Sequence, residues 1–482
     1  MKIIDLPPYA PLLMESTRAI GYNLESALAD ILDNSIAASA RKIDIRFTPY
    51  DDPYIAIIDN GCGMDKEKLI NSMRYGSYSV DDVREEKDLG RFGLGMKTAS
   101  LSQCRKLTVI SKCNNEINAC RWDLDHIQKT GKWSLICLNS TEIKKQLFID
   151  ELNNFESGTI IILQNIDKIV SDNSSLEDAL MIKMEDVRNH LSLVFHRYLS
   201  GEQGLGKIKI SINNNELKPI DPFLSNKSQQ IFAPEELKID NEKIIITPYL
   251  LPHLNNMTRK EIEMLGGDYG LKKNQGFYVY RNKRLLIWGS WFRLAKQEEL
   301  NKLARVKVDI PNTLDSQWTL DIKKSTASPP FCIRKNLRSI TEKICEKSKS
   351  TWNFRGRRET SDNIEHLWQR IITREGVIYK INENHPITLN LLEQCNDDKG
   401  LLQLLEMIGK YLPLNQIYSD LSSDKKITNI ENEDEIYKID SMISKLLEMQ
   451  NAKDKHKYLN LLENIEPFNS HKEIIDRHRK EL

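Results

Sequence analysis

Apolar residues recur with two different periods in the first 200 positions, and each period predicts a different kind of element. Over 24–40 the apolar residues Leu28, Ile31 and Leu32 recur at helical spacing, which predicts a helix with one buried side. Further patterns of alternation, short apolar runs and helical spacing predict strands at 42–49, 54–58, 107–111, 117–125 and 160–163 and a helix at 183–199. This part of the chain is therefore expected to pack helices on a mixed sheet.

Beyond position 200 the pattern changes and predicts two further regions. The expected elements are a hairpin with an Asn-rich turn over 207–217, two strands joined by a basic turn over 275–288, a strand over 318–324 and a helical segment over 437–462. A polar and acidic stretch precedes the last of these and is typical of a loop. We therefore expect three domains, over 1–200, 201–345 and 346–482.

The predicted helix over 24–40 carries polar groups that core packing does not require. Asp30 and Asn34 are four residues apart and so share one face of the helix, with Asp33 beside them. Mg²⁺ prefers oxygen ligands, and a water that attacks a phosphate needs a carboxylate as its base. Such residues are also common on ordinary hydrated helix faces, so this pair alone leaves that alternative open.

A second polar motif follows the predicted strand over 54–58. Asp59 ends this strand, and Gly61, Gly63 and Met64 come directly after it. A carboxylate at this place can accept a hydrogen bond from the exocyclic amine of adenine, and glycines let the backbone approach a ligand closely. An ordinary Asp-Asn-Gly turn is the alternative interpretation.

A glycine-rich loop leads into the next helical pattern. Its residues are Gly90, Arg91, Phe92, Gly93, Leu94, Gly95, Met96 and Lys97. Glycines let backbone N–H groups converge on phosphate oxygens, and a helix N-terminus adds positive potential. Lys97 either adds a charge or lies on the hydrated side. The spacing is neither that of a Walker P-loop nor that of a dinucleotide-binding unit, so we expect a lid that closes on a nucleotide.

Charge and cysteine content exclude several classes of protein. Lys plus Arg and Asp plus Glu are both 69, so contact with nucleic acid would need a local patch rather than a global field. The eight cysteines form no Cys-x-x-Cys pair, which argues against a zinc site and against a disulfide scaffold. The first residues lack the pattern of a signal peptide, and no apolar stretch reaches 18 residues. We expect a cytoplasmic protein without a membrane partner.

Four motifs occur in a fixed order: the acidic helix, the Asp59 turn, the glycine loop over 90–97, and Gly158-Thr159 at the start of a strand. In this order they resemble the ATP-binding domain shared by gyrase, a heat-shock chaperone, histidine kinases and MutL, the GHKL family. MORC-type and MutL-type ATPases and their bacterial relatives are the most similar members. The resemblance is strong over 1–200 and weaker to about 330. It implies an α+β fold: a GHKL (Bergerat) α/β sandwich, a transducer-type α/β domain and a mostly helical C-terminal region.

The resemblance also implies roles for individual residues, with ATP and Mg²⁺ as cofactors. Asn34 would hold Mg²⁺, and Asp30 would orient or deprotonate the attacking water. Asp59 would contact adenine, with Thr159 reaching it through a water. The remaining nucleotide contacts would come from Gly61, Gly63 and Met64 and from the loop residues Gly90, Arg91, Phe92, Gly93, Leu94, Gly95, Met96 and Lys97.

One departure and one long-range contact also follow from the resemblance. The family usually has Glu at the water-activating position, whereas Asp30 is one methylene shorter. Glu25 cannot substitute, because nine residues from Asn34 place it about half a turn away around the helix. Hydrolysis is therefore expected to be slow or to need a bridging water. Transducer-containing members send a lysine back to the γ-phosphate, and Lys324, next to Lys323, is the candidate here.

The expected partners are a second copy of the chain and double-stranded DNA. Relatives of this type clamp together as dimers when they bind ATP. Residues 334–358 hold nine basic side chains and two acidic ones, with Trp352 and Phe354 between them, which is typical of a phosphate-backbone contact or of a hydrated helix face. Family analogy places such a protein in DNA transactions or defence against phage.

Two other classes of function remain to be weighed. A nucleotide-gated binding module would recruit a partner nuclease or helicase and turn over little ATP of its own. A histidine kinase is disfavoured, because it needs a phosphoacceptor His before its ATP domain and the first His here is His126. A heat-shock chaperone is compatible with the first domain alone, but the rest of the chain is too short for one.

Overall fold

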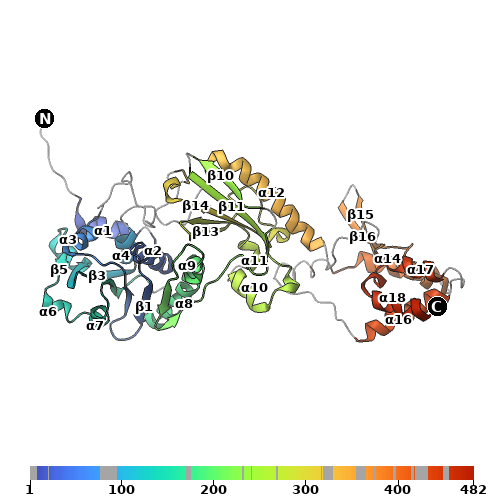
Figure 1. Cartoon of the computed structure of the whole chain (residues 1–482), viewed down its shortest axis with the longest axis horizontal. Helices are drawn as coiled ribbons and strands as arrows, with labels where there is room; N and C mark the ends of the chain where they lie inside the picture. The colour runs from blue at the N-terminus through green and yellow to red at the C-terminus, as the bar shows by residue number, and fades with distance from the viewer. Residues whose placement is uncertain are drawn as a thin grey trace. The chain divides into compact units, whose positions relative to one another are not determined.

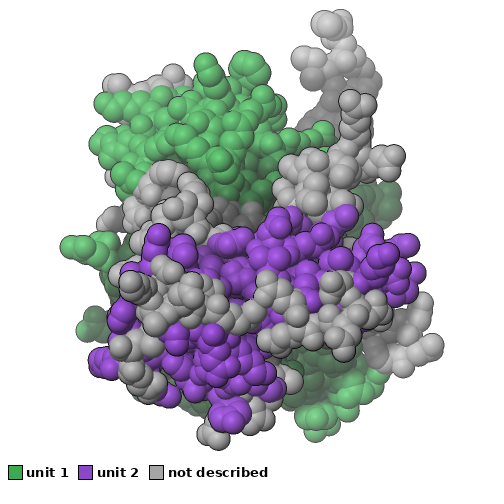
Figure 2. Space-filling view, turned by 90° about the vertical axis from the view of Figure 1, so that its right-hand side faces the viewer, with its two compact units in different colours: residues 1–353 green, residues 354–482 purple. Residues whose placement is uncertain are grey.

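The structure is a computed structural model of the 482-residue chain. It describes residues 8–19, 21–75, 95–169, 175–230, 233–239, 242–267, 270–315, 317–318, 329–353, 365–373, 376–394, 398–413, 417, 433–448 and 455–481. The chain divides into two compact units, residues 1–353 and residues 354–482, which Figure 2 colours separately. The first unit contains two sheets.

The first sheet has eight strands in the order β5-β4-β3-β6-β2-β1-β7-β8. Its strands are β1 (Lys42–Thr48), β2 (Tyr54–Asp59), β3 (Cys104–Cys113), β4 (Glu116–Asp123), β5 (Ile136–Cys137), β6 (Gly158–Ile166), β7 (Lys209–Ile212) and β8 (Asn215–Glu216). The β1–β7 pair is parallel and the other neighbouring pairs are antiparallel. The prediction of a mixed sheet is confirmed.

Helices pack on both faces of this sheet (Figure 1). They are α1 (Ala10–Arg18), α2 (Leu24–Ala37), α3 (Lys66–Met73), α4 (Gly95–Gln103), α5 (Leu124–Thr130), α6 (Ser140–Ile143), α7 (Ile149–Asn153), α8 (Leu176–Val194) and α9 (His196–Ser200). Residues of β2 alternate between the two faces, as a strand requires: Ile55 and Ile57 join the core beneath α2, α4 and α8, whereas Ile58 joins the core beneath α6 and α7. Both faces of the central strands are therefore buried.

Two sequence expectations for this region need refinement. The helix expected over 183–199 is two helices, because α8 ends at Val194 and α9 begins at His196. Phe195 between them is fully buried and has non-helical ψ, so the chain turns there to place its ring in the core. The first sheet also continues beyond position 200, since β7 pairs with β1 and β8 pairs with β7.

The second sheet has the strand order β10-β11-β14-β12-β13, with β9 pairing β11. Its strands are β9 (Gln229–Gln230), β10 (Glu235–Ile239), β11 (Glu242–Leu250), β12 (Gly276–Arg281), β13 (Arg284–Ser290) and β14 (Ala304–Ile310). The predicted pair of strands joined by a basic turn is the β12–β13 hairpin. Asn282 and Lys283 at its turn both have positive φ, as a two-residue primed turn requires.

Helices α10 (Arg259–Gly266), α11 (Gly270–Lys273) and α12 (Phe331–Asn353) accompany this sheet (Figure 1). The long helix α12 packs Ile333, Leu337, Ile340 and Ile344 against the strands, at the helical spacing of an amphipathic face. The strand expected over 318–324 has no structural test, because of these residues only Trp318, in a turn, lies within the described part.

The second unit contains a small hairpin and a separate helical core. Its elements are β15 (Trp368–Thr373), β16 (Gly376–Ile381), α13 (Pro386–Gln394), α14 (Asp398–Lys410), α16 (Glu433–Glu448), α17 (Lys455–Leu462) and α18 (Lys472–Glu481). Ile443, Leu459, Phe468 and Ile475 are fully buried at its centre. The helical pattern over 437–462 is confirmed within the described residues of α16 and α17. Among the described helices of the whole chain, none is long and apolar enough to cross a membrane.

Candidate functional site

The acidic helix predicted around position 30 is α2, and it presents two kinds of polar side chain. Asn23 caps its N-terminus by accepting a hydrogen bond from the backbone N–H of Ser26 at 3.0 Å. Asp30 and Asp33 are buried, whereas Asn34 is exposed. The Nδ2 of Asn34 donates to the backbone oxygen of Asp30 at 3.2 Å. The two residues predicted to share a helix face therefore do lie together.

Asp30 is held from two sides by residues outside α2. The hydroxyl of Tyr22 donates to its Oδ2 at 3.2 Å. On the other side, Nη2 of Arg284 lies 3.5 Å from its Oδ1. Arg284 also reaches Asp33, with Nε 3.1 Å from Oδ1. The carboxylate that we expected to activate water is therefore part of a buried polar cluster.

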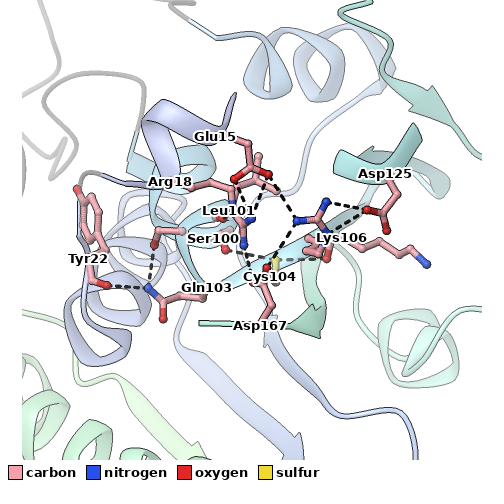
Figure 3. Close-up of polar contacts among 12 residues, drawn as sticks. Glu15, Arg18, Tyr22, Ser100, Leu101, Gln103, Cys104, Lys106, Asp125 and Asp167 are labelled. Carbon is pink, nitrogen blue, oxygen red and sulfur yellow. Dashed lines mark hydrogen bonds and ion pairs between the residues drawn. The ribbon is translucent and has the colours of Figure 1, made fainter. Parts of the chain in front are cut away.

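A network of polar contacts anchors the N-terminal segment that carries Tyr22 (Figure 3). The Nε2 of Gln103, at the end of α4, donates to the backbone oxygen of Tyr22 at 2.9 Å. Arg18 of α1 donates to the backbone oxygen of Leu101 at 2.7 Å and forms an ion pair with Asp167. These contacts fix α1 and Tyr22 against the helix that follows the glycine loop.

Asp59 lies at the end of β2, 3% exposed, opposite Thr159 of β6 in the sheet register. Its two oxygens accept hydrogen bonds at 2.8 Å each, Oδ1 from the backbone N–H of Gly61 and Oδ2 from the hydroxyl of Ser35. Burial raises the pKa of Asp59 above its usual value, although these hydrogen bonds act in the opposite direction. The backbone of Thr159 supplies a third hydrogen bond to this carboxylate. Because a carboxylate has about four acceptor positions, one remains for a donor such as the amine of adenine.

The turn after Asp59 is built into the sheet by close backbone contacts. Gly63 has a φ of +67°, and a Cβ there would overlap the carbonyl oxygen of Lys112, so only glycine fits. The backbone N–H of Met64 donates to the hydroxyl of Ser111 at 2.8 Å. The same hydroxyl lies 3.0 Å from that of Thr159. Asp59, Met64 and Thr159 therefore belong to one connected cluster.

The glycine loop is only partly described. Gly90, Arg91, Phe92, Gly93 and Leu94 lie outside the described residues, and Gly95 begins α4. Met96 is half-buried against the core. Lys97 is 2% exposed, and its Nζ donates to the backbone oxygens of Ser72 at 2.9 Å and Arg74 at 2.6 Å. Burial lowers the pKa of Lys97 to about 8. Its ammonium group therefore supports the C-terminus of α3 here, and its predicted phosphate contact stays a prediction.

The second sheet contributes a residue that the sequence did not indicate. The predicted lysine, Lys324, lies outside the described residues. Arg284 instead extends from the start of β13 to the two aspartates of α2. The only sequence signal for it was the basic turn between two predicted strands, and that signal does not specify which basic residue points at the first domain.

The side chains at this site fit a magnesium ion that is bound mainly by phosphates and waters better than they fit a metal ion bound only by protein ligands. No cluster of three or more His, Cys, Asp or Glu side chains with metal-binding geometry occurs among the described residues. Mg²⁺ is often bound by one or two protein oxygens together with phosphates and waters. Asn34 is exposed on α2 and its Nδ2 donates to the Asp30 backbone, so its carboxamide oxygen is the atom that could coordinate a cation. Asn34 fits the role of a single protein ligand.

Comparison with known proteins gives the same family. A family model described as histidine kinase-, DNA gyrase B- and HSP90-like ATPase matches residues 22–159. The chain is 29% identical over 106 residues to DNA mismatch repair protein PMS1 of Arabidopsis thaliana, covering 22% of this chain and 12% of that protein. It is 31% identical over 99 residues to ATPase MORC2B of Mus musculus, covering 20% and 10%. It is 32% identical over 95 residues to DNA mismatch repair protein MutL of Thermosipho melanesiensis, covering 19% and 17%.

The chain covers less than a fifth of the length of each of these relatives. The match to the family model includes α2, β2 and the first two residues of β6. The mixed α/β architecture of this part and the helical C-terminal region agree with the expected α+β fold. Residues 22–159 therefore form a GHKL-type ATPase domain, in a chain that is similar over part of its length to the ATPase MORC2B and to the DNA mismatch repair protein MutL.

Proposed function

We propose that the chain binds ATP with Mg²⁺ in its first domain and hydrolyses it slowly. The observation that carries this proposal is the continuous polar cluster on α2 and the ends of β2 and β6. Asn34 contacts Asp30 on the same helix, and Ser35 on that helix contacts Asp59 across to the sheet. The candidate cation ligand and the candidate base thus share one helix, and that helix contacts the candidate adenine acceptor through Ser35.

Each residue has a defined task in this scheme. Asp59 accepts the amine of adenine, and Thr159 shares a hydrogen bond with Ser111 beside it. Bound Mg²⁺ would neutralise phosphate charge, with the carboxamide oxygen of Asn34 as its protein ligand. Asp30 orients the attacking water and accepts its proton. Gly61, Gly63, Met64 and the loop over 90–97 complete the nucleotide contacts, and Lys324 is proposed to reach the γ-phosphate.

The nucleotide is proposed to act as a switch for an ATP-gated homodimeric clamp. Relatives of known name include DNA mismatch repair proteins and MORC ATPases, so double-stranded DNA is the proposed partner. The described part of α12 supports this choice. Arg334, Lys335, Arg338, Lys343 and Lys347 are exposed on it, whereas Ile333, Leu337, Ile340 and Ile344 face the second sheet. A basic helix face of this kind fits a phosphate backbone. Anti-phage defence is the proposed setting.

A second candidate function is a nucleotide-gated module that recruits a nuclease or helicase. One observation favours low turnover and so keeps this candidate. Asp30 has a shorter side chain than the usual Glu. In this case ATP binding and dimerisation would occur, but hydrolysis would be incidental.

The decisive experiment measures binding and turnover in the full chain. We expect millimolar or tighter ATP binding, phosphate release that needs Mg²⁺, and a change of mass from one copy to two with a non-hydrolysable analogue. Asp30→Ala is expected to bind ATP as the wild type does but to lose hydrolysis by about 100-fold or more. Unchanged phosphate release in Asp30→Ala would reject the catalytic assignment, and absence of ATP binding in the wild type would reject the whole proposal.

Duplex DNA separates the two candidate functions. Stimulation of turnover by DNA is expected for the clamp. For the recruitment module, dimerisation should follow ATP binding while turnover stays low with or without DNA. Charge reversal at Arg334, Lys335 and Arg338 tests the DNA contact on α12, with the exposed Lys227, far from α12 in sequence, as a matched control position.

A further inference from the structure

Arg284 is the first residue of β13, directly after the two-residue turn of the β12–β13 hairpin. It is 5% exposed. From there its guanidinium group crosses to the first domain, with Nε 3.1 Å from Oδ1 of Asp33 and Nη2 3.5 Å from Oδ1 of Asp30. A residue 251 positions away in sequence from Asp33 thus lies beside the candidate base.

The hairpin that carries Arg284 is fixed to the first domain by independent contacts. The hydroxyl of Tyr198 in α9 donates to the backbone oxygen of Asn282 in the turn at 2.6 Å. Nε2 of His196 lies 2.8 Å from the hydroxyl of Tyr280 in β12. The guanidinium carbon of Arg284 lies 5.9 Å from the ring centroid of Phe195. The position of the guanidinium group is therefore set by how the hairpin docks on α9.

Two buried carboxylates one helical turn apart need a counter-charge, and a guanidinium fork can serve both at once. If the role of Arg284 were only to neutralise a buried charge, its ion pair with Asp33 would be sufficient. The second contact, on Asp30, places Arg284 on one oxygen while Tyr22 holds the other. Asp30 is therefore held in one orientation by groups from two different parts of the chain, which matters for a side chain that is a methylene shorter than Glu.

We infer that Arg284 is a positioning residue for Asp30, and that through it the docking of the β12–β13 hairpin sets the rate of ATP hydrolysis in the first domain. This inference rests on the proposed function. Its content is a coupling between the domains: the second sheet supplies the group that aligns the candidate base of the first. Loss of the guanidinium group should leave nucleotide binding intact and slow the chemical step.

The test compares three variants of the full chain. Arg284→Gln is expected to lower kcat at least tenfold while KM for ATP and the affinity for a non-hydrolysable analogue stay within about threefold. Arg284→Lys keeps the charge but not the fork, so part of the lost kcat should return. Lys283→Gln is the matched control, because it removes a basic side chain from the turn of the same hairpin, whose ion pair is with Asp309 at 3.8 Å. Its kcat should stay within about twofold of the wild type.

Several results would overturn the inference. These are an unchanged kcat in Arg284→Gln, an equal loss in Lys283→Gln, or a raised KM with kcat unchanged. If Arg284→Gln does not fold, Arg284→Lys decides alone: a lowered kcat at constant KM supports the inference and a wild-type kcat rejects it. Failure of the proposed function is distinguishable, because then the wild type itself shows no ATP binding or no turnover that depends on Asp30.

Discussion

The two sheets of the first unit differ in the charges that they bury. Around the first sheet both signs are buried, and the carboxylates among them are Asp30, Asp33, Asp44 and Asp59. Around the second sheet the buried charged side chains of the described residues are all cations: Arg281, Arg284, Lys302 and Arg305. Buried charges are costly unless they are paired. The first sheet keeps carboxylates that a ligand can use, and the second sheet keeps cations that need partners.

Those partners show what each cation is for. Arg281 pairs with Asp315 at 2.7 Å and Lys302 pairs with Glu299 at 2.5 Å, both near the second sheet. Arg305 donates to backbone oxygens of the same region. Arg284, by contrast, forms ion pairs with Asp30 and Asp33 of the first domain. Arg281, Lys302 and Arg305 therefore stabilise the second sheet locally, whereas Arg284 connects the second sheet to the candidate site.

The largest expected effect concerns Arg305 and tests whether a buried cation of the second sheet acts on stability alone. Arg305→Met removes a guanidinium group that donates to the backbone oxygens of Pro222 and Leu265 and lies over the ring of Tyr278. The loss of charged hydrogen bonds to buried carbonyls should lower the free energy of unfolding by about 3 kcal/mol. Nucleotide affinity should stay within about twofold.

Urea unfolding and analogue binding measure the two quantities. Arg293→Met is the matched control, because Arg293 is exposed in the same region. This change should alter stability by less than about 0.5 kcal/mol. A large loss of nucleotide affinity in Arg305→Met would contradict this assignment, because a cation of the second sheet would then act at the candidate nucleotide site of the first sheet.

The second prediction concerns the contact between α9 and the second sheet, where His196 lies against Tyr280 of β12. Burial lowers the pKa of His196 to about 4, and the positive charge of Arg197 acts in the same direction. The folded protein then holds this histidine neutral while the unfolded chain binds a proton below about pH 6.5. Its contribution is therefore fully present above pH 6.5 and is lost as the pH falls toward 4, by about 3 kcal/mol.

Urea unfolding at several pH values checks this dependence. In His196→Asn the free energy of unfolding should fall less steeply between pH 6.5 and 4 than in the wild type. His126→Asn, which changes an exposed histidine, should reproduce the wild-type curve. If the free energy of unfolding depends on pH equally steeply in the wild type and in His196→Asn, His196 does not remain neutral in the folded protein.

The third prediction tests the ligand side of the comparison. Asp59→Asn replaces an acceptor oxygen by an amide donor, which opposes the amine of adenine and leaves Ser35 and Gly61 to share one oxygen. ATP affinity should fall by about 100-fold, and the preference for ATP over GTP should weaken. Competition binding with both nucleotides measures this change.

Asp44→Asn is the control for that experiment. Asp44 is a carboxylate of similar burial in the same sheet, paired with Lys42 at 2.9 Å and accepting from Ser211. Its loss should leave nucleotide affinity within about twofold. An equal loss of affinity in both variants would mean that Asp59 acts through sheet stability rather than through contact with adenine.

The contacts also explain how much the sequence could predict. The helix that carries Asp30 and Asn34 follows from local periodicity, and the place of Asp59 follows from a strand that meets a Gly-rich turn. Each of these signals spans only a few residues, so it can be recognised in the sequence without knowledge of the fold. The expected pairing of Asp59 and Thr159 in one site is supported by their opposite positions in the register.

Other features depend on distant parts of the chain and so escaped sequence reasoning. Arg284 reaches Asp30 only because the hairpin docks on α9, and no local pattern encodes that docking. Lys97 was a candidate for phosphate binding because of its place after the glycines, but its Nζ meets the carbonyl oxygens at the end of α3. Ser35 was overlooked because a serine inside an apolar helix gives no signal of the aspartate that it contacts.

The smallest effect is expected at Ser35, and it measures how finely the first sheet positions its carboxylate. The Ser35 hydroxyl donates to Oδ2 of Asp59 at 2.8 Å, and both residues are buried. Ser35→Ala removes one of the three hydrogen bonds that fix the carboxylate and favour its charged form. A single hydrogen bond of this kind contributes about 1 kcal/mol, so ATP affinity should fall by about fivefold.

Because Ser35 acts through Asp59, the preference for ATP over GTP should weaken by a similar factor, and the double variant with Asp59→Asn should lose less than the sum of the two single changes. Ser211→Ala is the matched control, because its hydroxyl donates to Asp44 in the same sheet. Additive losses in the double variant would show that Ser35 acts on the nucleotide by another route, and would limit the adenine site of the first sheet to Asp59 and its backbone partners.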